Sequence, residues 1–170
     1  MKPKPVSKAK FFTGVMYSDK KTYSAVVKAL KKKFGEIEEE SEPYDFTKFT
    51  RYYVPEMGKK ILKKFLVFKK PINRDNLADI KLFTNEIEDK YAKKSKRKIN
   101  LDPGYLTLHN LVLASAKDRA HKIYLKKGIY ADLTLIFHKN TCEHFQHTFP
   151  DFKSEKVKEF FCRVRNKLKN

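Results

Sequence analysis

The sequence predicts an α+β fold: a single domain with a ferredoxin-like split βαβ antiparallel sheet and two helices, extended by a C-terminal β-hairpin and a closing helix. Three observations support this prediction. The first six segments follow the order strand, helix, strand, strand, helix, strand. The chain has 170 residues, a length typical of one domain. Apolar residues make up 41% and aromatic residues 14%, enough to fill a core although 35% of residues are charged.

The N-terminal part is predicted to contain a tail, a strand and a helix. Residues 1–9 are expected to form a flexible basic tail in which prolines block regular structure, so the domain spans residues 10–170. Residues 11–17 form an apolar run typical of a buried strand. Asp19 is placed to cap a helix that extends to Phe34, because the apolar residues between them recur at helical spacing.

The next segments change in charge and composition. Residues 36–46 are rich in Glu and Asp, and we expect an extended segment beside the lysines of the first helix that offsets part of their field. Residues 44–58 are dense in aromatic side chains and end in a turn, and residues 60–71 carry an apolar strand. Asn73 is expected to cap a second helix. Its buried side would consist of Leu77, Ile80, Phe83, Ile87 and Tyr91.

The C-terminal half adds strands and one helix. A basic linker at 93–98 leads to a short strand at 99–101, and another strand is predicted at 111–115. A hairpin at 121–137 and a short strand near 142–147 follow. The chain closes with a helix whose buried side consists of Val157, Phe160, Phe161, Val164 and Leu168. We find no internal repeat.

The hairpin is predicted to turn through a three-residue loop, Lys126-Lys127-Gly128, with the glycine in the left-handed conformation. One face is then apolar and ends at His121, whereas the other carries a Tyr–Tyr and a Lys–Asp pair and meets solvent. The predicted pairs are Leu125 with Ile129, Tyr124 with Tyr130, Ile123 with Ala131, Lys122 with Asp132, and His121 with Leu133.

This register determines how His121 and Asp132 are interpreted. Asp132 is expected to be an exposed ion-pair partner of Lys122. His121 lies at the edge of an apolar face, where its ring nitrogens need partners, and Asp102 or Asn100 are the candidates. Two interpretations stay open: a core histidine with satisfied hydrogen bonds, or a general base or ligand-binding histidine.

Asp102-Pro103-Gly104-Tyr105 fits a type II turn, and a tight turn alone would explain these residues. The functional alternative places Asn100 and Asp102 beside His121, so that an Asp–His pair orients a general base. Candidate catalytic residues are Asp102, His121 and Glu56, and candidate ligand-binding residues are Asn100, Tyr105, Lys117, Tyr130, Asp132, Asn85 and Lys81. Neither a serine-hydrolase motif nor a phosphate-binding loop is present.

A metal site is not predicted. Cys142, His144 and His147 lie within six positions, but strand alternation puts His147 on the opposite face from the other two. A structural zinc also needs four ligands, and the neighbouring sequence offers no fourth.

The chain carries 39 Lys and Arg against 20 Asp and Glu, a formal charge of +19 that would attract polyanions. A general bias toward lysine is the alternative explanation. With two cysteines, no secretory signal and no transmembrane segment, the sequence predicts a cytoplasmic protein. Cofactors and oligomeric state are not determined by these features.

The first functional hypothesis is a module that binds RNA, DNA or a nucleotide through basic residues of the first helix, of the linker at 93–98 and of the closing helix. The second is a small enzyme acting on a phosphorylated or nucleotide substrate with an Asp/His/Glu site. The third is a scaffold that docks a protein through the aromatic segment at 44–53. The sequence leaves open whether the protein is an enzyme.

Several motifs also resemble a bacterial family known as a domain of unknown function, DUF4416. They are Tyr44-Asp45-Phe46-Thr47, the segment 53–58, Ile80-Lys81 with Thr84-Asn85, and the segments 100–105, 111–117, 121–135 and 149–152. The resemblance implies a single cytoplasmic domain and no particular reaction. Some members are labelled as GTP-binding, but Gly58-Lys59-Lys60 lacks the first glycine and the hydroxyl residue of a phosphate-binding loop. Phe149 and Phe152 stand where many relatives are expected to have Tyr, so a role for a phenol at these positions is not supported.

Overall fold

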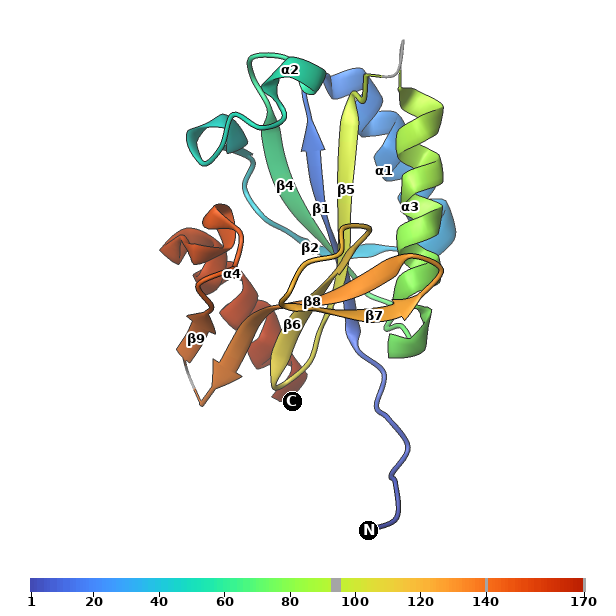
Figure 1. Cartoon of the computed structure of the whole chain (residues 1–170), viewed down its shortest axis with the longest axis vertical. Coiled ribbons are helices and arrows are strands. Elements are labelled where there is room, and N and C mark those ends of the chain that lie inside the picture. The colour runs from blue at the N-terminus through green and yellow to red at the C-terminus, as the bar shows by residue number, and fades with distance from the viewer. Residues whose placement is uncertain (93–95, 140, 170) are drawn as a thin grey trace.

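The computed structural model describes residues 1–92, 96–139 and 141–169 (Figure 1). These residues contain one nine-stranded antiparallel sheet and four α-helices, so the predicted α+β class is confirmed. The strands are β1 (Lys10–Tyr17), β2 (Ile37–Glu40), β3 (Tyr44–Asp45), β4 (Leu62–Phe68), β5 (Ile99–Leu106), β6 (Asn110–Ser115), β7 (Lys122–Lys126), β8 (Ile129–His138) and β9 (Thr141–His144). The helices are α1 (Lys20–Phe34), α2 (Val54–Met57), α3 (Leu77–Tyr91) and α4 (Glu155–Asn166).

The strand order in the sheet is β2-β4-β1-β5-β6-β8-β7, with β3 paired to β4 and β9 paired to β8. Residues 1–8 have no regular structure, and Ala9 forms an isolated bridge to Ile72. Within the described ranges, no helix has both the length and the apolar character that a membrane span requires.

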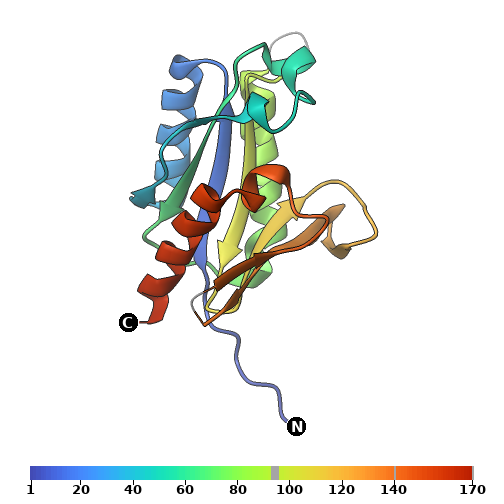
Figure 2. The ribbon, with the colours of Figure 1, turned by 90° about the vertical axis from the view of Figure 1, so that its left-hand side faces the viewer.

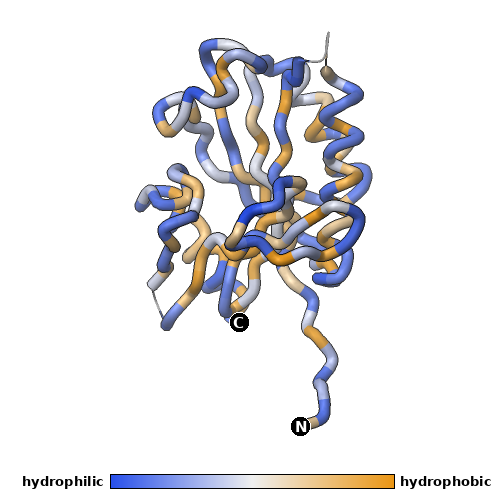
Figure 3. The backbone as a smooth tube through the Cα atoms, viewed as in Figure 1, coloured by the Kyte–Doolittle hydropathy of each residue, from blue (hydrophilic) through white to orange (hydrophobic). Residues whose placement is uncertain are grey.

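Helices α1 and α3 pack on one face of the sheet. Strand alternation sends Phe11 and Val15 of β1 to this face, where they meet Leu30 of α1 and Ile80 of α3. The predicted N-cap of α1 is confirmed, because the Asp19 carboxylate accepts hydrogen bonds from the backbone of the first turn. In Figure 3 apolar and hydrophilic residues alternate along α3, as expected of a helix with one buried face.

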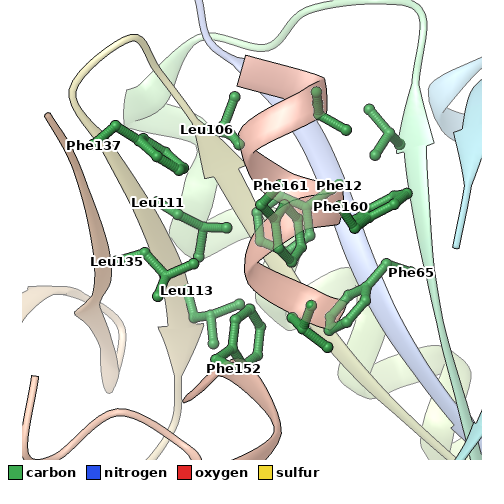
Figure 4. Close-up of a cluster of buried hydrophobic side chains, with 13 residues drawn as sticks. Phe12, Phe65, Leu106, Leu111, Leu113, Leu135, Phe137, Phe152, Phe160 and Phe161 are labelled. Atoms are coloured by element: carbon green, nitrogen blue, oxygen red, sulfur yellow. The ribbon is translucent and has the colours of Figure 1, made fainter. Parts of the chain in front are cut away.

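Helix α4 covers the opposite face of the sheet. Phe12, the neighbour of Phe11 on β1, points to this side and stacks edge-on against Phe161, with ring centroids 4.9 Å apart. Figure 4 shows Phe160 and Phe161 of α4 surrounded by apolar side chains of the sheet. In Figures 1 and 2 the sheet separates α4 from α1 and α3.

The predicted turn at Asp102-Pro103-Gly104-Tyr105 is wrong, because β5 continues through all four residues. Pro103 pairs with Thr13 of β1, and β6 pairs with β5 only from Gly104 onward. A Cβ atom at Gly104 would lie 2.5 Å from the Val112 carbonyl oxygen and 2.7 Å from the Phe12 ring. The glycine is therefore needed for close strand packing rather than for a turn.

The hairpin between β7 and β8 differs from the prediction in its loop. The loop has two residues, Lys127 and Gly128, both with positive φ (52° and 74°). A bulge between Tyr124 and Lys126 leaves Leu125 without a partner, so that Lys126, not Leu125, pairs with Ile129. The predicted pairs Lys122–Asp132, Ile123–Ala131 and Tyr124–Tyr130 are confirmed.

The two faces of the hairpin are also different from the prediction. On β8 the apolar residue Ile129 packs under α3 as expected. On β7, however, which is an edge strand of the sheet, Ile123 is 71% exposed. The Lys122 and Asp132 side chains are only 4% and 3% exposed, so this end of the expected solvent face is buried, whereas Tyr124 on the same face is 58% exposed.

Three boundary and contact predictions also need correction. The acidic segment forms β2 beside β4, and its glutamates form ion pairs with Lys10, Lys64, Arg163 and Lys167 rather than with lysines of α1. Helix α3 begins at Leu77 after a 3-10 turn (Arg74–Asn76), and the Asn73 side chain makes no capping hydrogen bond. Strand β9 ends at His144. Of the predicted basic linker, residues 93–95 lie outside the described residues.

Candidate ligand-binding cleft

A cleft of about 560 Å³ lies where α3, the first half of β5 and the segment between β6 and β7 meet. In Figure 1 this segment crosses near the centre of the molecule, in front of β5. Residues from five separate parts of the chain form the cleft wall. They include Tyr53, Lys81, Asn85, Glu88, Arg97, Asn100, Asp102, Ser115, Lys117, Arg119, His121, Lys122, His147 and Phe149.

The Arg97 guanidinium organises one wall of the cleft. It donates two hydrogen bonds to Glu56, at 2.6 and 2.8 Å, and one to the Asn100 side-chain oxygen at 2.7 Å. It also donates to Glu88 at 3.1 Å. These hydrogen bonds lower the pKa of Glu56. Glu56, predicted as a second catalytic acid, therefore holds Arg97 in place and does not line the cleft.

Glu88 joins α3 to β5 behind this wall. Its side chain is buried and accepts a hydrogen bond of 2.7 Å from the Leu101 amide. Burial raises the pKa of Glu88. Lys81 donates to the Leu101 carbonyl at 2.7 Å and lies 3.8 Å from the Glu88 carboxylate. The predicted phosphate contact Lys81 thus lines the cleft but is already engaged by the protein.

Asp102 lies between two buried groups. Its Oδ1 accepts a 3.0 Å hydrogen bond from the Asn100 side-chain amide, and its Oδ2 lies 3.6 Å from the Lys63 ammonium group. Lys63 in turn donates to the fully buried Asp151 at 2.7 Å, and Asp151 accepts a hydrogen bond from Tyr44 at 2.8 Å. Burial and the Asp151 carboxylate raise the pKa of Tyr44. The Asp102 carboxylate is therefore held from behind by a charged network.

His121 forms the other wall, and its partner differs from the prediction. Its Nε2 lies 3.7 Å from Oδ2 of Asp132, not beside Asp102 or Asn100 as a ring partner. His121 lies in the turn directly before β7 (Lys122–Lys126), so the alternation of the strand does not determine the direction of its side chain. Lys122 also contacts Asp132, at 3.3 Å, and donates to Ser115 at 2.7 Å. The predicted Lys122–Asp132 pair is thus confirmed, but it is buried.

His147 completes this wall and was not predicted as a site residue. Its ring stacks on His121 with centroids 4.0 Å apart and planes 17° from parallel, and its Nε2 lies 3.0 Å from the Leu133 carbonyl oxygen. One potential metal-ligand atom from each of His121, Asp132 and His147 lies within 4.8 Å of the others. A metal bound to histidine lies about 2.0–2.1 Å from nitrogen in the plane of the ring. Two parallel stacked rings cannot both meet this condition, so the geometry favours stacking over shared coordination.

A second pocket, of about 290 Å³, adjoins the cleft and is rich in aromatic side chains. Tyr52 and Phe149 are 66% and 44% exposed at this pocket, and the Lys117 ammonium group lies 4.7 Å from the Tyr52 ring centroid. The rest of the aromatic segment is less accessible, since Phe46 is buried in the core. The residues that line both the pocket and the cleft are Tyr53, Asp102, Leu113, Lys117 and Phe149.

The structure thus brings together most of the predicted site residues. Those that line the cleft are Asn85, Lys81, Asn100, Asp102, Lys117 and His121. Glu56 and Asp132 lie directly behind it, in contact with Arg97 and His121. Tyr105 and Tyr130 do not line it: Tyr105 packs against the cluster under α3, and Tyr130 packs against Tyr124.

Sequence reasoning missed Arg97, Glu88, His147 and Lys63. The helical spacing of α3 could have indicated Glu88, because Lys81, Thr84 and Glu88 are polar residues on a side of this helix that is buried.

A family model described as "Domain of unknown function (DUF4416)" matches residues 7–168. The chain belongs to the DUF4416 family. The DUF4416 match includes both walls of the cleft. No curated protein and no solved structure matches the chain.

Proposed function

We propose that this protein binds a nucleotide, with the base in the aromatic pocket and the phosphates in the cleft. The observation that carries this proposal is the continuity of the two cavities, which share Tyr53, Asp102, Lys117 and Phe149. A ligand that occupies both needs a flat ring at one end and negative charge at the other. A nucleotide has this chemistry.

The aromatic pocket supports binding of the base. Tyr52 and Phe149 come from different loops and keep much of their ring surface exposed. Stacking of a nucleobase on an aromatic side chain contributes roughly 1–3 kcal/mol and depends little on which base is present. Exposed rings at the edge of a pocket are more informative than the buried phenylalanines, whose contacts are already made within the core.

The cleft supports binding of phosphate. Five basic residues line it (Lys81, Arg97, Lys117, Arg119 and Lys122), against three acidic ones (Glu88, Asp89 and Asp102). Among the described residues, Lys117 and Arg119 form no ion pair with a carboxylate. These two side chains are therefore the ones available to a phosphate group, with the His121 ring beside them.

A small ligand fits the structure better than a long RNA or DNA strand. The lysines of α1 and the basic residues of α4 lie on opposite faces of the sheet, so they do not form one continuous surface. Arg163 and Lys167 are paired with Glu39. Arg165 is buried and donates to the backbone carbonyl groups of Leu108 and Lys139. Much of the predicted basic surface on α4 thus serves intramolecular contacts.

The test is isothermal titration of the purified chain with the four ribonucleoside triphosphates at low salt. We expect saturable binding of at least one, weakened about tenfold by Lys117→Ala because one charge-assisted contact is lost. Lys31→Ala, on the exposed side of α1, is the matched control and should leave affinity unchanged. Absence of saturable binding for all four nucleotides would rule out the proposal.

A second candidate function is catalysis on the bound phosphorylated ligand. The observation that favours it is His121, which lines the cleft with a buried carboxylate 3.7 Å from its Nε2. Such a histidine can transfer a proton as a general acid or base. The measurement is phosphate release from a bound nucleotide by wild type and by His121→Asn. Equal rates in both would exclude this role for His121.

Two further predictions from the sequence, the ferredoxin-like arrangement and the cytoplasmic location, are kept as proposals. The antiparallel order β2-β4-β1-β5, with α1 and α3 on one face, supports a ferredoxin-like unit at the start of the chain. The two free thiols, Cys142 and Cys162, support a reducing cytoplasmic location. Protease mapping of the folded domain and localisation of the protein in cell fractions would test the domain limits and the compartment.

A further inference from the structure

We infer that the ligand is a ribonucleotide and that Asp102 binds the hydroxyl groups of its ribose. This inference rests on the proposed nucleotide-binding function and names the part of the ligand that the protein selects. It assigns Asp102 to ligand binding in place of the catalytic role predicted from the sequence.

The position of Asp102 is the first argument. Of the residues that line both cavities, Asp102 is the one with a carboxylate; the others are Tyr53, Leu113, Lys117 and Phe149. A ligand whose base lies in the aromatic pocket and whose phosphates lie in the cleft must pass its middle part across this junction. In a nucleotide the middle part is the sugar.

The free hydrogen-bonding capacity of Asp102 is the second argument. A carboxylate can accept about four hydrogen bonds. One is used, from the Asn100 amide to Oδ1, whereas the Lys63 ammonium group lies 3.6 Å from Oδ2, beyond a normal hydrogen bond. The side chain is 28% exposed. Two vicinal hydroxyl groups, as in ribose, would supply donors to both oxygens, and a carboxylate serves this purpose in dinucleotide-binding sites.

The rigidity of Asp102 is the third argument. Asn100 is buried and is itself fixed by the Arg97 guanidinium. Lys63 is buried and is fixed by Asp151. Pro103, the next residue, restricts the backbone within β5. A carboxylate held in this way is preorganised, so binding a sugar would require little loss of side-chain freedom.

These features predict discrimination against deoxyribose. When a site is built to pair with a hydroxyl group, a ligand without that group leaves the protein acceptor unpaired and binds more weakly. Because Asp102 is partly exposed and water can replace the lost hydroxyl, we expect a loss of about tenfold for either the 2′-deoxy or the 3′-deoxy analogue.

The first part of the experiment compares ligands on the wild-type chain, so this part does not depend on the stability of a variant. The tightest-binding ribonucleoside triphosphate is titrated beside its 2′-deoxy and 3′-deoxy analogues by calorimetry. Asp102→Asn, which keeps the shape of the side chain, should reduce the ratio of ribo to deoxy affinity to near one. Lys31→Ala, on the exposed side of α1 and outside the cleft, is the control and should preserve the ratio.

The outcomes separate this inference from the proposed function. Equal wild-type affinity for the ribo and deoxy ligands would overturn the ribose assignment and leave nucleotide binding intact. A preference for ribose that persists in Asp102→Asn would overturn the role of Asp102. Failure of every nucleotide to bind would overturn the proposed function and, with it, the assignment.

Discussion

Arg97 holds Glu56 through two parallel hydrogen bonds, from Nε to Oε1 at 2.6 Å and from Nη2 to Oε2 at 2.8 Å. Glu56 belongs to the short helix α2, whereas Arg97 lies two residues before the start of β5. The same guanidinium contacts Glu88 on α3 and Asn100 on β5. One side chain therefore connects three elements at the wall of the cleft, and bidentate pairs of this kind are geometrically specific.

Replacing Glu56 tests this connection through the pH dependence of stability. The Arg97 contacts lower the pKa of Glu56 in the folded state, so the pair stabilises the fold above the pKa of the unfolded chain and this contribution is lost as pH falls through the folded value. We expect Glu56→Gln to lower the free energy of unfolding by about 1–2 kcal/mol at pH 7.

The difference between wild type and Glu56→Gln should shrink as pH falls below the pKa of unfolded Glu, roughly 4.3, and should be lost once pH is below the lowered pKa of folded Glu56. Urea unfolding at several pH values measures it. Glu86→Gln, an exposed position on α3, is the control. A difference that stays constant down to pH 3 would contradict an ionised Glu56 paired with Arg97.

Gly104 is predicted to be intolerant of any side chain. Because a Cβ atom there would collide with the Val112 carbonyl and the Phe12 ring, Gly104→Ala should destabilise the protein by about 3 kcal/mol or more. Gly128→Asn, in the hairpin loop, should cost less than about 1 kcal/mol because Asn tolerates a positive φ. Thermal unfolding of the two variants distinguishes a packed strand glycine from a turn glycine, and equal losses would contradict the strand assignment.

Lys63 is predicted to be needed for the stability of the fold, because its removal leaves the buried Asp151 carboxylate without an ionic partner. Lys63→Met leaves the fully buried Asp151 carboxylate without its ionic partner, which should cost about 3–5 kcal/mol. The double variant Lys63→Met/Asp151→Leu removes both charges and should recover a substantial part of this loss. Urea unfolding gives the free energies of wild type, of the single variants Lys63→Met and Asp151→Leu, and of the double variant. A double variant as unstable as the sum of the single variants would mean that the two side chains do not interact.

The hairpin faces can be tested by one substitution at two positions. Ile129→Thr places a hydroxyl group in the cluster under α3 and should cost about 2 kcal/mol. Ile123→Thr changes a side chain that is 71% exposed and should alter stability by less than about 0.5 kcal/mol. Chemical unfolding measures both. A larger loss at Ile123 than at Ile129 would contradict the exposure of Ile123.

Local sequence patterns were sufficient for much of the secondary structure. The helix from Lys20 to Phe34, with Asp19 as its N-cap, was predicted because capping and helical spacing depend on residues within a few positions of one another. The closing helix and its buried phenylalanines were predicted for the same reason. The candidate residues Asn100, Asp102, His121 and Lys117 do line one cleft, although the contacts between them were not foreseen.

The errors occurred where a local signal competed with a distant partner. Asp102-Pro103-Gly104-Tyr105 has the composition of a turn, but pairing with β1 keeps it extended. The hairpin was expected to have one solvent face. Helix α3 covers the face of β8 that carries Ile129, as predicted, but Asp132 on the opposite face is also buried.

The sequence by itself determined the α+β class, the positions of most helices and strands, and the family, because these depend on composition, periodicity and short motifs. Only the tertiary structure decided that Asp132 accompanies His121, that Arg97 and Glu88 support the cleft, and that an aromatic pocket adjoins it at Asp102. These contacts join residues of different secondary-structure elements and loops. Their geometry follows from strand register and helix packing, which no single segment encodes.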